Sequence, residues 1–486
     1  MVRIANPVAV EAETPLGPSQ QSKRLPWYII AASAVTAVLI TLAVLTVTVR
    51  STDGFAVWSD GLVYFLYARS GVVDRDLDIT DEFNYLNARI PPGSRAMEPL
   101  RKWTIHRADG TVQAPWPVGA GLILTPFYAV GYGLESVVAK LSGRAADSYG
   151  LIPQCAFVLG SVAFGVVGFW CLVLLCREVT SDQFSYLASL GVVLCGPGVF
   201  YVLVHPSMAH ASSFGLIAGL TLIWLRSWTR GSTAYTLLAL GLVLGVATTV
   251  RYQNALFGIL PGALVLKEWR QAGFVWAARR AVIAGMAFML PVALLLHGQL
   301  RVSAVPAQTA LSVAQYPIDL TSPYFWDVLF SCRHGAFYWA PVLGMSLAGL
   351  VWASLNGNRW PAALLVAFAA HVYLIGGLGL SNIAYGGHQP APGWLHHWDD
   401  APSFGMRYLT ECAPVFALGL ACLMKAARRH VGPTGWTAIL APFVLWNVLL
   451  ILAYGLETIT RSGCLPYKDM FSGFAVALHR LLQHWV

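Results

Sequence analysis

An aspartate that follows the first hydrophobic segment is the clearest candidate for acid–base chemistry. Asp60 stands in the stretch WSDGLVYFLYARSG, about ten residues after an apolar run ends, and Tyr64 and Tyr67 follow it. A carboxylate between aromatic side chains near a membrane surface is partly desolvated, which makes it a better proton acceptor. We therefore predict that Asp60 is a general base.

Several cationic and imidazole side chains near the ends of other apolar segments could bind an anion. They are Arg251 in ATTVRYQN, Arg407 in SFGMRYL, Arg333 and His334 in LFSCRHGAF, and His210 in HPSMAHASSF. An arginine inside a membrane is costly and normally pairs with an anion or a buried carboxylate. A guanidinium suits phosphate, which it binds through two parallel hydrogen bonds. For Arg251 the sequence leaves both a phosphate ligand and a structural ion pair open.

Acidic residues are concentrated in one segment. Residues 50–116 contain nine of the 23 Asp and Glu residues of the chain. The simpler interpretation is a solvated loop whose carboxylates pair with neighbouring arginines such as Arg69. A second interpretation is that Asp76 or Asp78 folds back towards Asp60 and contributes to the same site.

A metal site is compatible with the sequence but is not defined by it. The segment 382–405 contains His388, His396, His397 and two aspartates, all of which can bind divalent metals. Their spacing matches no established ligand pattern. A divalent metal therefore stays possible, with its ligands unknown.

Composition identifies the elements that must position these residues. Of 486 residues, 57% are hydrophobic and 11% are charged, and the mean hydropathy is +0.61. Soluble proteins contain about 25% charged residues. The long apolar runs predict an all-α, polytopic integral membrane protein. The net charge of +8 does not indicate nucleic-acid binding, because the basic residues lie in short loops between spans.

Hydropathy and length predict about eleven transmembrane helices in a single domain, 27–455. Residues 1–26 are expected to form a cytoplasmic tail before a retained signal anchor, and residues 456–486 an outer tail. The predicted spans are 27–49, 150–176, 183–203, 208–226, 233–250, 253–267, 280–299, 337–355, 361–381, 406–424 and 435–455.

One further apolar segment, 117–141, creates a conflict of topology. If every basic loop is cytoplasmic, the segments 204–207, 300–336 and 382–405 lie outside. Lys23 and Arg24 also place the N-terminus inside, so residues 50–116 must be outside. Both conditions hold only if 117–141 does not cross the membrane. We therefore predict a long first outer loop, 50–149, in which 117–141 is an interfacial or re-entrant helix.

The cysteines divide into two groups. Most lie within apolar runs and are expected to be packing residues. Cys332 and Cys464 are both expected on the outer side, where a disulfide is permitted. The spacing does not determine whether they pair.

The order of several motifs resembles the GT-C superfamily of membrane glycosyltransferases, in a bacterial branch related to protein mannosyltransferases and aminoarabinose transferases. The stretches that carry the resemblance are SDGLVYFLYARSGVVDRDLDITDEF, APWPVGAGLILTPFY, HPSMAHASSF, VRYQN, LFSCRHGAFYWAP and SFGMRYL. No nucleotide-binding motif such as a Walker loop occurs in a suitable context. A donor delivered by lipid at the outer face agrees with that pattern.

The resemblance implies a sugar donor linked to polyprenyl phosphate and an acceptor that is a lipid, a glycan or a protein. It implies a site on the outer face of the bacterial cytoplasmic membrane, with inverting chemistry and Asp60 as the base. Arg251 and Arg407 become candidates for the donor phosphate, with His210 and Arg333 as lesser ones. The family often has paired acids at the first-loop position, whereas here Gly61 follows Asp60. This departure puts a metal site with two carboxylates in doubt.

Two other classes of function fit part of the pattern. A transporter or flippase of a lipid-linked or polar substrate would use broken helices and charges within the membrane, and Arg251 fits that description. The acidic outer loop and the absence of an evident inverted repeat favour an enzyme instead. A polysaccharide polymerase or ligase would present similar outward arginines.

Overall fold

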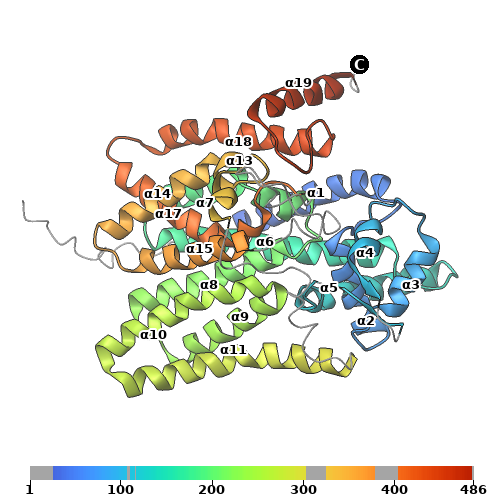
Figure 1. Cartoon of the computed structure of the whole chain (residues 1–486), viewed down its shortest axis with the longest axis horizontal. Helices are drawn as coiled ribbons and strands as arrows, with labels where there is room; N and C mark the ends of the chain where they lie inside the picture. The colour runs from blue at the N-terminus through green and yellow to red at the C-terminus, as the bar shows by residue number, and fades with distance from the viewer. Residues whose placement is uncertain (1–25, 107–109, 115, 303–323, 378–402, 484–486) are drawn as a thin grey trace, which may run out of the picture.

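The chain is a helical membrane protein. The computed structural model describes residues 26–106, 110–114, 116–302, 324–377 and 403–483 (Figure 1). Its longer helices are α1 (Trp27–Ser51), α5 (Gly119–Leu141), α6 (Leu151–Arg177), α7 (Asp182–Cys195), α8 (His210–Arg230), α9 (Ala234–Val250), α10 (Ile259–Ala272), α11 (Phe274–Val302), α14 (Pro341–Leu355), α15 (Trp360–Gly377), α17 (Ala413–Ala427), α18 (Pro433–Gly455) and α19 (Tyr467–Gln483).

Within the described residues, seven helical segments are long and apolar enough to span a bilayer. They are α1, α5, α6, Phe274–Leu296 in α11, α15, the segment Arg407–Ala427, and α18. Helices α9 and α14 are apolar but shorter. Each of the eleven predicted spans contains helix, and several are interrupted. The prediction of hydrophobic helices is confirmed, whereas the number of crossings stays a prediction.

Two interruptions are important for the site. Helix α7 ends at Cys195, because Gly196, Pro197 and Gly198 follow, and the π-helical segment η1 (Phe200–Val204) continues the chain. The segment predicted as a span, 183–203, is therefore helical with an interruption at Gly196 and Pro197. Helix α9 ends at Arg251, whose backbone is extended (φ −148°, ψ 119°), and the 3₁₀ segment η2 (Tyr252–Gly258) follows. This is the predicted break between two apolar segments.

The segment predicted as the first outer loop is folded. Before α5 it contains α2 (Asp60–Val73), α3 (Thr80–Arg89), α4 (Glu98–Trp103) and the two-stranded antiparallel pair β1 (Ile105–His106) and β2 (Val112–Gln113). Arg69 joins its parts: the guanidinium donates to Glu82 at 2.9 Å, pairs with Asp74 and lies 4.7 Å from the ring centroid of Tyr149. The predicted pairing of the loop acids with a nearby arginine is thus confirmed for Arg69.

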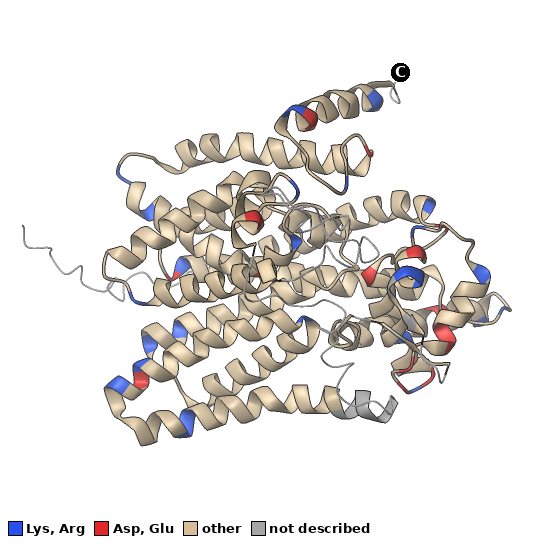
Figure 2. Ribbon diagram, in the orientation of Figure 1, with Lys and Arg blue, Asp and Glu red and all other residues tan. Residues whose placement is uncertain are grey.

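Acidic residues are concentrated at one end of the molecule. In Figure 2 they gather around α2 to α4, which we call the acidic end although basic positions also lie there, whereas basic positions predominate at the opposite ends of α8, α10 and α11. The basic end contains local ion pairs, such as Arg226 and Arg230 with Glu178. That this end faces outside is the topology predicted from the short basic loops between spans, and it stays a prediction.

Helix α5 packs across the acidic end. It contacts α2, α6 and α9, and Figure 1 shows it nearly end-on while α6, α11 and α18 run across the view. Its buried positions include Leu124, Tyr128 and Gly131, while Val130, Leu134 and Leu141 are exposed and apolar. The helix is therefore apolar on both its packed and its outward face.

Candidate functional site

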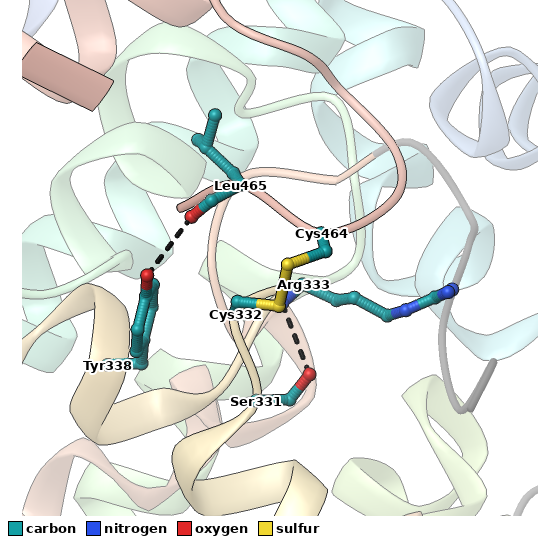
Figure 3. Close-up of a disulfide and its surroundings, with 6 residues drawn as sticks. All are labelled: Ser331, Cys332, Arg333, Tyr338, Cys464 and Leu465. Carbon is teal, nitrogen blue, oxygen red and sulfur yellow. Dashed lines mark hydrogen bonds between the residues drawn. A yellow bond between two sulfur atoms is a disulfide. The ribbon is translucent and has the colours of Figure 1, made fainter. Parts of the chain in front are cut away.

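A disulfide fixes the segment that contains Arg333 and His334. Cys332 and Cys464, 132 residues apart, form a disulfide that joins the turn after α12 (Phe325–Phe330) to the segment before α19. The Leu465 amide donates to the Cys332 carbonyl, and the Tyr338 hydroxyl donates to the Leu465 carbonyl. Figure 3 shows the Arg333 side chain extending away from the disulfide. The structure therefore pairs Cys332 with Cys464, which the spacing alone did not determine.

Asp60 begins α2 and is partly buried. The preceding residue, Ser59, has φ 56° and ψ −140°, a region that costs a residue other than glycine about 1–3 kcal/mol. Surrounding contacts must hold this backbone, and one of them is a stack of Trp58 on His205, with ring centroids 3.7 Å apart and planes 3° apart. Burial lowers the pKa of His205 to about 3, so this ring is neutral at pH 7.

Close packing explains why a second acid does not follow Asp60. A Cβ atom at Gly61 would lie 2.5 Å from the Ser207 Cβ and 2.8 Å from its carbonyl oxygen. Such distances allow no side chain at position 61 without a shift of the backbone. The HPSMAH segment thus occupies the space that a side chain at position 61 would need.

Replacement of Gly61 by alanine is expected to destabilise the fold by about 1–3 kcal/mol, the usual cost of overpacking. Gly71 lies in the same helix, and a Cβ there meets only the Asp76 carbonyl at 3.8 Å. Gly71→Ala should be neutral or slightly stabilising, because alanine favours helix. Thermal unfolding of both purified variants checks the difference. Equal midpoints would mean that the contact with Ser207 is looser than described.

The charges of Asp60, Arg251 and Arg407 all affect the pKa of Tyr64. Its side chain is buried, one helical turn after Asp60. Burial raises the pKa of Tyr64, the negative charge of Asp60 raises it further, and the positive charges of Arg251 and Arg407 lower it. All three charged groups are therefore close enough to act on one phenol. The roles assigned to Asp60, Arg251 and Arg407 from the sequence stay predictions.

Arg251 does have a carboxylate partner. Its Nε lies 2.5 Å from Oε1 of Glu411, which is fully buried. Its Nη1 is 3.3 Å from Nε2 of His210, and its Nη2 donates to Gln253 at 3.3 Å. Arg251 is thus part of an ion pair, while its two terminal nitrogens make only long contacts.

Arg407 and Arg251 both lie near the ring of Tyr408. The Arg407 and Arg251 guanidinium carbons lie 5.0 and 5.6 Å from the ring centroid of Tyr408, and Arg407 donates to the Tyr408 hydroxyl at 3.0 Å. Arg407 begins the 3₁₀ segment η4 (Arg407–Cys412), which also contains Glu411. The positive charge of Arg407 also contributes to the lowered pKa of His205.

The other predicted residues have separate positions. Asp76 accepts from the Ser70 hydroxyl at 2.6 Å, and Asp78 accepts from the Thr80 amide at 2.9 Å, so both stabilise the turn between α2 and α3. His334 lies 5.7 Å from Trp339, ring to ring. No group of three His, Cys, Asp or Glu residues suited to a metal occurs in the part of the chain that the structure describes. The histidines of 382–405 fall outside that part.

Sequence reasoning missed Glu411 and Tyr408. Glu411 is an acid inside an apolar segment, RYLTECAPVFALG, and such an acid normally has a buried cationic partner. That rule, applied together with Arg251, could have predicted the ion pair. The position of Tyr408 between two arginines depends on the turn at η4 and has no comparable signal.

Comparison with known proteins gives structural similarity only. No protein-family model and no curated protein sequence matches the chain. ArnT from Cupriavidus metallidurans bound to undecaprenyl phosphate is similar over 92% of this chain and 77% of that chain, at 15% identity and a TM-score of 0.47. The archaeal oligosaccharyltransferase AglB from Archaeoglobus fulgidus, in complex with an inhibitory peptide and a dolichol-phosphate, is similar over 90% of this chain and 57% of that chain, at 12% identity and a TM-score of 0.44.

Proposed function

We propose that the protein is an inverting glycosyltransferase that moves a sugar from a polyprenyl-phosphate donor to a lipid, glycan or protein acceptor at the outer face of the membrane. The observation that carries the proposal is that the Arg407 and Arg251 guanidinium groups lie 5.0 and 5.6 Å from the ring of Tyr408, and their charges and that of Asp60 all affect the pKa of Tyr64. A base beside cations is the arrangement that displacement of a phosphate leaving group requires. The resemblance of the motif order to the GT-C superfamily supports the same reaction.

In the proposed reaction the acceptor hydroxyl oxygen attacks the anomeric carbon, and Asp60 takes the hydroxyl proton. The bond between that carbon and the donor phosphate oxygen breaks, and its electron pair stays on the phosphate. The leaving group gains one negative charge, so cations beside it stabilise the transition state more than the ground state. Arg251 and Arg407 are the groups assigned to this role, with His210 beside Arg251.

An outer position for the site is supported by the packing of α5. A Cβ at Gly119 would contact Thr249, near the end of α9, and one at Gly131 would contact Pro153, at the start of α6. The opposite ends of α9 and α6 adjoin the basic segments around Arg230 and Arg177. Since both contacts of α5 are at the acidic end, we propose that α5 lies along the outer surface and does not cross.

Cysteine labelling tests this topology. Lys140 and Ser142 are exposed at the C-terminal end of α5, so Lys140→Cys and Ser142→Cys should react with an impermeant maleimide from the same side as Asp81→Cys in the acidic loop. Gln271→Cys, in the last turn of α10 beside Arg270, should react only from the opposite side. Reaction of the α5 positions together with Gln271→Cys would make α5 a transmembrane span.

The proposed reaction is tested with purified protein in lipid. Supplied with a set of polyprenyl-phosphate sugars and with membrane extract as acceptor, the protein should release polyprenyl phosphate, detected by mass spectrometry. Deletion of the gene should remove a specific lipid-linked or surface glycan. Movement of intact donor across vesicles without its cleavage would instead support a flippase. Cleavage of diphosphate-linked oligosaccharides alone would support a polymerase or ligase.

A further inference from the structure

A fully buried carboxylate lies behind the site. Glu411 belongs to η4, within the apolar segment Arg407–Ala427, and its side chain has no exposed surface. A buried carboxylate is stable only with close cationic or hydrogen-bonding partners. Its closest partner is Arg251, and His210 Nδ1 lies 3.7 Å from the same oxygen, Oε1.

The contacts around Arg251 are unequal. The Nε atom lies 2.5 Å from Glu411 Oε1 in an ion pair, whereas Nη1 is 3.3 Å from His210 and Nη2 is 3.3 Å from Gln253. A guanidinium held through Nε keeps both terminal nitrogens available for a second planar acceptor. The ion pair at Nε is therefore shorter than either contact of the terminal nitrogens.

We propose that Glu411 is a positioning residue, which holds the Arg251 guanidinium through Nε so that its terminal nitrogens can bind the phosphate of the donor. The inference rests on the proposed function. It gives η4 two roles, because the same short segment supplies Arg407 to the site and Glu411 to orient Arg251.

A purely electrostatic role for Glu411 makes the opposite prediction. A negative charge near the phosphate repels it, so loss of that charge alone would tighten anion binding. Glu411→Gln removes the charge and keeps an oxygen at the same reach. Glu411→Asp keeps the charge but draws it back by about 1.5 Å, one carbon–carbon bond, and opens the contact with Nε.

The experiment measures binding of undecaprenyl phosphate to the purified full-length protein in detergent. Glu411→Asp is expected to weaken binding and raise the KM for the donor by about tenfold, with Glu411→Gln within about threefold of wild type. Wild-type affinity for Glu411→Asp, or tighter binding by Glu411→Gln alone, would overturn the inference. A role in folding alone would lower the yield of folded protein without changing its affinity.

A double-mutant cycle covers the case in which Glu411→Gln does not fold. Arg251→Lys keeps the charge but lacks Nε, so adding Glu411→Asp to it should weaken binding no further. Additive losses would mean that Glu411 acts independently of Arg251, which contradicts the inference. If wild type binds no undecaprenyl phosphate, the proposed function fails together with the inference. If wild type binds it and Glu411→Asp is unchanged, the inference fails alone.

Discussion

Replacement of Asp60 by asparagine is expected to lower the rate of sugar transfer by about 10²–10⁴-fold, the usual contribution of a positioned general base. Asparagine has the same shape and can still accept from the Ser59 hydroxyl, which lies 3.3 Å from Asp60 Oδ1. It cannot take a proton at neutral pH. The donor should bind with unchanged affinity, because its phosphate is assigned to the arginines. The measurement is kcat and KM for release of polyprenyl phosphate.

The matched control for Asp60 is Asp81→Asn. Asp81 is exposed in the first turn of α3, so its replacement removes one negative charge from the same outer loop without touching the site. Transfer by this variant should stay within about twofold of wild type, as expected for an exposed charge. If Asp60→Asn retains wild-type kcat, another group accepts the proton. If both variants lose activity equally, the loop acts through its total charge.

The membrane helices were predictable because hydropathy is a property of local sequence. Lipid forces the backbone of an apolar run to hydrogen bond within itself, so length and composition are sufficient to locate a helix. The interruptions were only partly predictable. Arg251 identified one, whereas the end of α7 before Gly196 and the π-helical turn after it were overlooked inside a continuous apolar run. Glycine and proline at 196–198 were the available signal.

The fold of the segment predicted as the first outer loop could not be derived from local pattern. Its acids suggested a solvated segment, yet Glu82 is buried, and burial raises the pKa of its carboxyl to about 7. Arg69, which binds Glu82 and lies over Tyr149, joins residues far apart in sequence. The disulfide between Cys332 and Cys464 is likewise a long-range contact, and spacing carries no information about it.

The candidate site was predictable in its chemical groups and not in their partners. Costly residue types near membrane ends identified Asp60, Arg251, His210 and Arg407, because such residues are rarely placed there without a reason. The interactions that orient them depend on tertiary packing. The stack of Trp58 on His205 and the contact of Gly61 with Ser207 join the first loop to a segment almost 150 residues later.

Replacement of Arg407 is the second change expected to have a large effect on the rate of sugar transfer. Arg407→Gln is expected to reduce kcat by about 10²–10³-fold, the typical cost of removing one preorganised donor from a developing oxyanion. Its charge affects the pKa values of Tyr64 and His205, and its guanidinium donates to the Tyr408 hydroxyl at 3.0 Å. The reduction should be larger in kcat than in KM, because the phosphate gains charge only as the bond breaks.

Replacement of Arg461 tests whether Arg407 acts through a specific contact or only through its positive charge. It also contributes to the lowered pKa of His205, but its guanidinium pairs with Glu457 at 3.1 Å. Arg461→Gln should therefore change kcat by less than about threefold, since a partly exposed ion pair contributes little. Equal losses for Arg407→Gln and Arg461→Gln would show that net charge near the site is what matters. A loss confined to Arg407→Gln would place its guanidinium at the leaving phosphate, where the transition state requires a fixed cation.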